Sequence, residues 1–200
     1  MATSQREYQA MLLDILPRQG GWGASEYIWL TDRARRLIEY DDGEIEVLPM
    51  PTEIHQAILT LLTRALLQYL DPRGGVIRFA PLRLRLSVDK YREPDLLVLL
   101  DHDDPRRAPR YWLGADWVLE VVSPDDPARD LVTKRREYAE AGIPEYWIVN
   151  PLDRTVTVLT LQSGGGAFSE HGVFRAGGTA TSVLLPGFAV MVDEIFAELD

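Results

Sequence analysis

Two kinds of apolar pattern run along the chain, and together they predict a mixed α/β fold. Residues 94–100 and 117–122 are apolar on both faces, which is typical of strands in the middle of a covered sheet. Residues 53–70 and 130–141 instead repeat apolar positions at helical spacing. Because strand, helix and strand follow one another over residues 117–149, the sequence predicts a parallel, right-handed crossover.

Two hairpins are predicted beside this sheet. Residues 37–48 form two short strands around Asp41-Asp42-Gly43, where the glycine supplies the positive φ of a tight turn. Residues 155–161 and 167–175 flank a glycine run, and alternation in the first strand predicts one solvated face. We expect a single α/β domain over residues 1–200, with a mixed central β-sheet flanked by helices and peripheral β-hairpins.

Shorter patterns indicate the remaining elements. They are an amphipathic helix over residues 4–16, a short helix within 25–36, strands over 76–79, 82–88 and 145–150, and a short strand, a turn and a closing helix within 183–200.

Composition excludes several classes of protein. The chain has no cysteine, which excludes disulfides and thiolate metal sites, and its three histidines are too far apart for a histidine-built zinc site. The net charge of −10 argues against a protein that coats nucleic acid by charge alone, although a local basic groove stays compatible with it. No apolar run is long enough to cross a bilayer and no signal pattern opens the chain, so we expect a cytoplasmic protein without a membrane partner.

An acid stands inside one of the two apolar strands. Glu120 interrupts Trp117 to Val122, and burying an ionised carboxylate without a partner costs several kcal/mol. Asp95 stands at the entrance of the other strand, and central strands are expected to be neighbours. Two such carboxylates and a backbone carbonyl are ligands that Mg²⁺ takes, and a cation would offset the cost of burying Glu120.

Lys134 is the third candidate of this group. It follows Leu131 by three residues and precedes Tyr138 by four, so it lies on or beside the buried stripe of its helix. A lysine directed at two carboxylates could orient an attacking water and stabilise charge on a phosphate oxygen. The simpler alternative is a buried structural salt bridge between Glu120 and Lys134.

These motifs resemble those of a known superfamily. Pro94-Asp95 and Glu120-Val121-Val122 are similar to the metal motif of PD-(D/E)xK nucleases, and residues 37–160 resemble the Uma-type restriction endonucleases in motif order. The resemblance implies a restriction-endonuclease-like core and magnesium- or manganese-dependent phosphodiester cleavage. Asp95 and Glu120 would be metal ligands, and Val121 would lend its carbonyl. The superfamily lysine is replaced by Val122, and the Uma-type pattern gives that role to Lys134.

The resemblance also adds accessory positions, each of which has a simpler interpretation. Glu44 would otherwise be a solvated hairpin residue, His55 a polar residue at a helix start, Asp130 an N-cap and Tyr138 a core residue. Arg83 and Arg85 alternate with leucines, so they indicate a solvated strand face that could contact phosphates. The matching stretches are Gly43-Glu44, His55, Pro94-Asp95, Glu120 to Pro124, Asp130 with Lys134 and Tyr138, and Gly142 to Trp147.

Three functional hypotheses remain at this point. The first is a magnesium-dependent endonuclease acting on DNA, for which a homodimer is compatible because a two-strand cut uses two sites. The second is a non-catalytic nucleic-acid-binding or assembly domain, which predicts a Glu120–Lys134 pair buried without an open cleft. The third is a phosphodiesterase acting on a small nucleotide, a substrate that suits an acidic surface better than a long duplex.

Overall fold

The computed structural model describes residues 16–197. The helix predicted over residues 4–16 lies almost wholly outside this range. None of the helices within the range is both long and apolar enough to cross a membrane.

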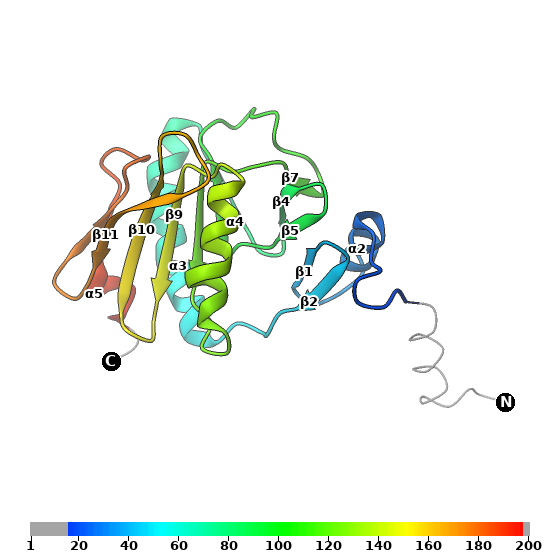
Figure 1. Ribbon diagram of the computed structural model, residues 1–200. Coiled ribbons are helices and arrows are strands. Elements are labelled where there is room, and N and C mark those ends of the chain that lie inside the picture. The colour runs from blue at the N-terminus through cyan, green and yellow to red at the C-terminus, as the bar shows by residue number, and fades with distance from the viewer. Residues whose placement is uncertain (1–15, 198–200) are drawn as a thin grey trace.

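A six-stranded mixed sheet forms the centre of the molecule (Figure 1). Its strand order is β11-β10-β9-β8-β6-β3, and only β8 and β9 run parallel, as the crossover predicted. The predicted mixed sheet is thereby confirmed. The strands are β3 (Val76–Phe79), β6 (Leu96–Leu99), β8 (Trp117–Val121), β9 (Glu145–Asn150), β10 (Thr155–Leu161) and β11 (Phe168–Phe174).

Helices cover both faces of this sheet, so β6 and β8 are buried on both sides. Figure 1 shows α3 (Glu53–Leu70) behind the sheet and α4 (Arg135–Glu140) in front of it. Thr52 accepts a hydrogen bond from the His55 amide and caps α3. Leu96 and Leu119 pack with α3, whereas Leu97 and Val118 pack on the α4 side. Successive side chains of β6 and β8 therefore point alternately into two hydrophobic cores, and neither face of these strands is exposed to solvent.

A second, five-stranded sheet was not predicted. Its order is β2-β1-β5-β4-β7, and the predicted hairpin over residues 37–48 forms one end of it. The strands β5 and β7 are too short to leave a periodic signal in the sequence. Tyr27, Tyr40 and Tyr91 form the aromatic core beneath this sheet. The elements are α2 (Ala24–Thr31), β1 (Ile38–Asp41), β2 (Glu44–Val47), β4 (Arg83–Ser87), β5 (Lys90–Arg92) and β7 (Tyr111–Trp112).

The C-terminal segment differs from its prediction and covers part of the central sheet. It contains β12 (Thr179–Thr181), β13 (Ala189–Met191) and α5 (Val192–Ile195). Within residues 183–200, where a strand was expected before the turn, the strand β13 follows the turn. Phe188 and Val190 of this segment share a core with Val156 of β10. The prediction that β10 has one solvated face is wrong, because much of that strand is covered on both sides.

Glu145 fastens the C-terminal segment to the sheet. Its side chain is fully buried, and Oε1 accepts hydrogen bonds from the indoles of Trp117 (3.1 Å) and Trp147 (2.7 Å) and from the Ser182 hydroxyl (2.6 Å). Oε2 accepts hydrogen bonds from the backbone amides of Val183 and Leu184, each at 2.8 Å. One carboxylate thus satisfies donors from three separate stretches of the chain.

We expect Glu145→Ala to lower the free energy of unfolding by more than about 3 kcal/mol, because each buried donor left without a partner costs about 1–3 kcal/mol. Urea unfolding followed by tryptophan fluorescence measures this. Glu140→Ala is the control, since Glu140 is exposed and its change should stay within about 0.5 kcal/mol. Equal effects of the two substitutions would contradict a fastening role for Glu145.

Candidate active site

Asp95 and Glu120 face each other across two adjacent central strands. Leu96 of β6 pairs with Leu119 of β8, so one further step of the antiparallel register places Asp95 opposite Glu120. Glu120 lies between Val118 and Val122 and points, like them, toward α4. Asp95 Oδ2 also accepts a hydrogen bond from the Val121 amide at 2.7 Å. The prediction that the strands carrying these two acids are neighbours is confirmed.

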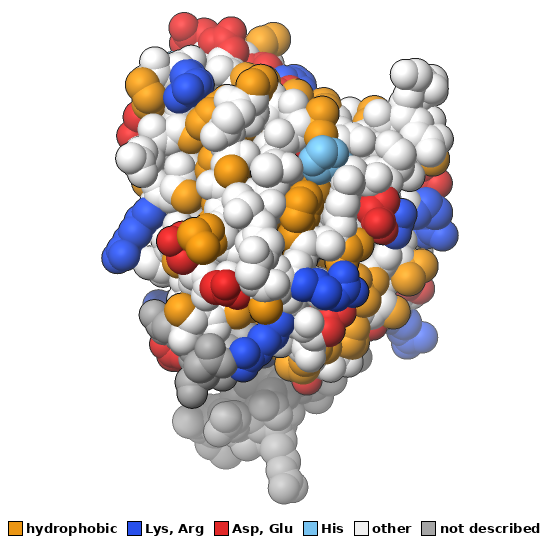
Figure 2. Space-filling view, turned by 90° about the vertical axis from the view of Figure 1, so that its left-hand side faces the viewer, with side chains coloured by type: hydrophobic (Ala, Val, Ile, Leu, Met, Phe, Trp, Pro, Cys, Tyr) orange, Lys and Arg blue, Asp and Glu red, His pale blue; other side chains and the backbone are white. Residues whose placement is uncertain are grey.

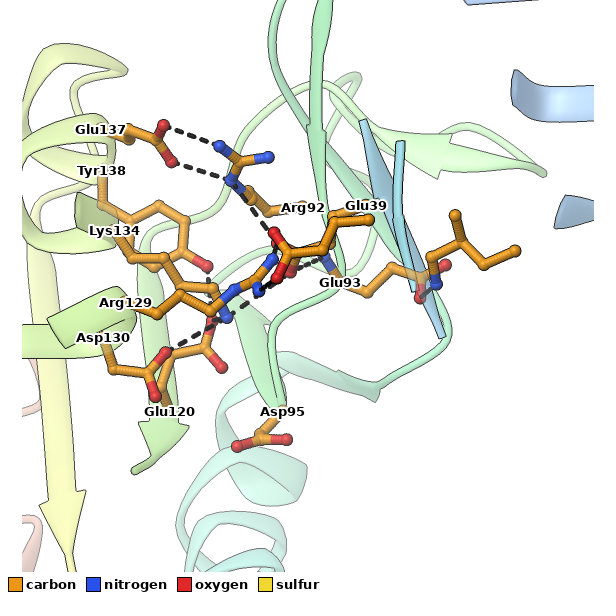
Figure 3. Close-up of polar contacts among 12 residues, drawn as sticks. Glu39, Arg92, Glu93, Asp95, Glu120, Arg129, Asp130, Lys134, Glu137 and Tyr138 are labelled. Atoms are coloured by element: carbon orange, nitrogen blue, oxygen red, sulfur yellow. Dashed lines mark hydrogen bonds and ion pairs between the residues drawn. The ribbon is translucent and has the colours of Figure 1, made fainter. Parts of the chain in front are cut away.

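Lys134 reaches Glu120 from the segment before α4, on the inward side that the helical spacing predicted. Its side chain is 4 % exposed, and its Nζ lies 2.8 Å from Glu120 Oε1 and 3.3 Å from Asp130 Oδ1 (Figure 3). The turn that carries it, η2 (Arg129–Lys134), is a π-helical segment preceding α4, and such segments often occur at functional sites. Asp130 lies inside this turn and Ala128 is the N-cap, so the N-cap interpretation of Asp130 is wrong.

A third carboxylate, Glu39, was missed by the sequence analysis. It approaches from β1, on the side opposite to η2 and α4 in Figure 3, and Oε1 lies 3.5 Å from Lys134 Nζ. Oε2 forms ion pairs with Arg129 at 2.7 Å and with Arg92 at 3.6 Å. The signal that could have found Glu39 is an acid between two apolar residues, Ile38 and Tyr40, which repeats the pattern around Glu120.

The buried acids respond differently to their surroundings. Burial alone would raise the pKa of Glu39, but the positive charges of Lys134, Arg129 and Arg92 outweigh this effect and lower the pKa to about 2. Burial also raises the pKa of Glu120, and Lys134 does not overcome it. The neighbouring carboxylate of Asp95 adds to the rise, and the pKa of Glu120 comes to about 8. The site therefore holds more negative charge than its own lysine compensates.

Tyr138 and His55 each hold one of the two acids. Tyr138 is fully buried, as its core interpretation requires, and its hydroxyl donates to Glu120 Oε1 at 2.5 Å. His55 Nε2 lies 3.0 Å from Asp95 Oδ1, so the start of α3 contacts the start of β6. Tyr138 belongs to α4 and His55 to α3, so helices on opposite faces of the sheet each contact one of the two acids.

The remaining predicted residues form no hydrogen bond or ion pair with Asp95, Glu120 or Lys134, although Arg83 borders the same cavity as those three. Glu44 is exposed and borders a second cavity of about 340 Å³, whose wall also includes Glu39 and Lys134. Arg83 is 7 % exposed and pairs with Asp32 at 3.1 Å, so the prediction of a solvated strand face is wrong for it. Its side of β4 is covered by α2. Arg85 is half-buried and donates to the backbone carbonyl of Ser87 at 3.1 Å.

The acids and the lysine open onto one large cleft. Its volume is about 1410 Å³, and its wall includes His55, Asp95, Glu120, Asp130 and Lys134. Val121, whose carbonyl was predicted to be a metal ligand, also borders it. A buried Glu120–Lys134 pair is thus present together with an open cleft, a combination that the non-catalytic hypothesis did not predict.

The donor set of this cleft suits a hard divalent cation. Glu120 uses Oε1 for both of its hydrogen-bonded partners, and its Oε2 bonds to no other group in residues 16–197. A cation between Asp95 and Glu120 would offset the burial and the repulsion from Asp95 that together raise the pKa of Glu120. Within the same residues, no three His, Asp or Glu side chains converge as a ready-made metal cluster. Backbone carbonyl, water or phosphate oxygens would therefore complete the coordination.

We expect Glu120→Gln to stabilise the metal-free protein at pH 8 but not at pH 5. The folded pKa of Glu120 is about 8 and that of an unperturbed glutamate is 4.5. The folded state therefore binds more protons between these values, and wild-type stability falls as the pH rises through that window. Glutamine stays neutral, so the variant should gain on the order of 1 kcal/mol over wild type at pH 8.

Urea titrations in the presence of EDTA at both pH values measure this difference. Glu140→Gln serves as the exposed control, and its free energy of unfolding should differ from that of wild type by the same amount at both pH values. A Glu120→Gln variant that loses stability relative to wild type as the pH rises would show that the ionised form of Glu120 is the favoured one.

Comparison with known proteins identifies the family. A family model described as Uma2, "Putative restriction endonuclease", matches residues 24–193. The uncharacterized protein slr1290 of Synechocystis sp. is 30% identical over 115 residues, which cover 57% of this chain and 60% of that protein. The crystal structure of "a putative nuclease belonging to DUF820" from Anabaena variabilis is similar with a TM-score of 0.74 at 21% identity, over 90% of this chain and 99% of that one. The structural likeness shows a shared fold, and the family match shows that the chain belongs to the Uma2 family of restriction-endonuclease-like proteins.

Proposed function

We propose that this protein is a metal-dependent endonuclease that hydrolyses phosphodiester bonds of DNA. The observation that carries the proposal is the meeting of Asp95, Glu120 and Lys134 in one cleft, from two neighbouring strands and a helix. The family description and the nuclease-like fold support the same class of activity. A homodimer would supply one such site for each strand of a duplex.

The proposal assigns a role to each residue of the candidate site. Asp95, Glu120 and the Val121 carbonyl would hold Mg²⁺ or Mn²⁺, which when bound supplies Lewis-acid activation of water and charge neutralisation on the phosphate. Lys134 would orient the attacking water and stabilise negative charge on a phosphate oxygen. Tyr138 and His55 would keep the two acids in place, and Glu39 and Asp130 would hold the ammonium group.

A non-catalytic binding or assembly domain is the second candidate. It is favoured by the close Glu120–Lys134 pair of 2.8 Å, which could serve structure alone. Calorimetric titration with Mn²⁺ separates the two candidates. The endonuclease proposal requires binding that is lost in Asp95→Asn, whereas the non-catalytic domain requires no binding in either protein.

We expect the purified protein to nick or linearise supercoiled plasmid with Mg²⁺ or Mn²⁺ and to be inactive with EDTA. Asp95→Asn, Glu120→Gln and Lys134→Met should each lower the cleavage rate about a hundredfold or more, because each removes a ligand or the ammonium group. Agarose-gel assays under single-turnover conditions measure the rate.

Lys90→Met is the matched control for Lys134→Met. Lys90 is the chain's other lysine and contacts a buried carboxylate, Glu137, at 2.7 Å, but it does not border the cleft. Cleavage by Lys90→Met should stay near the wild-type rate. Undiminished cleavage by Asp95→Asn and Glu120→Gln would refute the proposed site.

A further inference from the structure

We propose that the cleft accepts an unpaired DNA strand in preference to an intact duplex, an inference that rests on the proposed endonuclease function. It goes further by naming the conformation of the substrate. Three features of the cleft carry it: the depth of the acids, an apolar rim and a small set of free arginines.

The reacting groups lie deep in the cleft. Glu120 and Lys134 are each 3 % exposed, although both border the open space. A scissile phosphate must therefore enter well below the surface to meet them. A single strand can bend its backbone into such a recess, whereas stacking and pairing keep a duplex straight unless bending energy is supplied.

The rim of the cleft is unusually apolar. Val47, Met50, Phe79 and Leu152 are 52 %, 63 %, 43 % and 56 % exposed, and all four border this one cleft. The outside of a duplex presents phosphates and sugars, which gain little from such a surface. An unpaired strand presents the faces of its bases, which stack on aromatic and apolar side chains without regard to sequence.

Among these rim residues, Phe79 lies beside Asp95 in the sheet. It ends β3 and pairs with Leu96 of β6, the residue that follows Asp95. The next amide after it, that of Ala80, donates to the Asp95 carbonyl at 3.4 Å. An exposed ring thus lies one residue from the acid proposed to hold the metal, where it can support a base adjacent to the cleaved bond.

The positive charge available to DNA is local. Arg35, Arg36 and Arg64 are exposed, border the cleft and form no ion pair with any residue in 16–197. The charges of Arg129 and Lys134 are already compensated by buried carboxylates. The chain as a whole carries −10, and Figure 2 shows acidic and basic side chains interspersed on the face around β11. A few phosphates at the cleft can be bound, but a long duplex would meet a mostly acidic surface.

Fluorescence anisotropy of the full chain in EDTA tests the inference without cleavage. The probes are a labelled 20-nucleotide DNA of mixed sequence, alone and annealed to its complement. We expect the unpaired strand to bind about tenfold more tightly than the duplex, and Phe79→Ala to weaken only the unpaired strand, by about fivefold or more. Trp29→Ala is the matched control, because Trp29 is also an exposed aromatic residue but lies outside the cleft, so its substitution should not change binding of either probe.

Three results would overturn the inference. One is a duplex that binds as tightly as the single strand, and a second is a Phe79→Ala variant that behaves like Trp29→Ala. Effective competition by a dinucleotide at the same nucleotide concentration would also overturn it, in favour of a small-nucleotide substrate. Because binding is measured without metal, a protein that fails to cut plasmid can still show the preference for the unpaired strand. A protein that cuts plasmid but binds both probes equally would contradict this inference and leave the proposed endonuclease function intact.

Discussion

The site depends on one ammonium group placed among three carboxylates. Lys134 contacts Glu120 of β8, Asp130 of η2 and Glu39 of β1, so a single charge joins the central sheet, the helix that covers it and the second sheet. Lysine is rare in this chain, which has two among its 21 Lys and Arg residues. A compact ammonium fits between three acids, whereas a planar guanidinium needs a wider, forked arrangement such as the one Arg92 finds at Glu137.

The same arrangement leaves the site electrostatically incomplete. Lys134 and the flanking arginines keep Glu39 ionised, with its pKa lowered to about 2, but they do not do so for Glu120, whose pKa rises to about 8. Asp130, which is also buried, has a raised pKa for the same reason. Excess negative charge deep in a cleft opposes folding, and a protein tolerates it where a bound cation or substrate compensates the charge.

The sequence predicts the centre of this site better than its surroundings. Apolar runs place Asp95 and Glu120 on neighbouring strands, and helical spacing directs Lys134 inward, since both inferences use periodicities within one element. Glu39 could not be placed in this way, because it reaches Lys134 from a hairpin about 95 positions earlier through pairing of the second sheet. Arg83 was misplaced for a related reason: alternation shows that β4 has two faces, but not that α2 covers one of them.

The hairpin of β1 and β2 connects the two parts of the functional argument. One of its strands supplies Glu39, which holds the lysine, while the other ends at Val47 and leads into the apolar rim at Met50. Arg129 ties both strands to η2 through ion pairs with Glu39 and Glu46. The element that would contact the substrate is therefore also the element that positions the amine, so displacement of the hairpin would alter both together. Glu39 belongs to none of the sequence motifs, yet through its hairpin it connects substrate binding with the charge balance around Lys134.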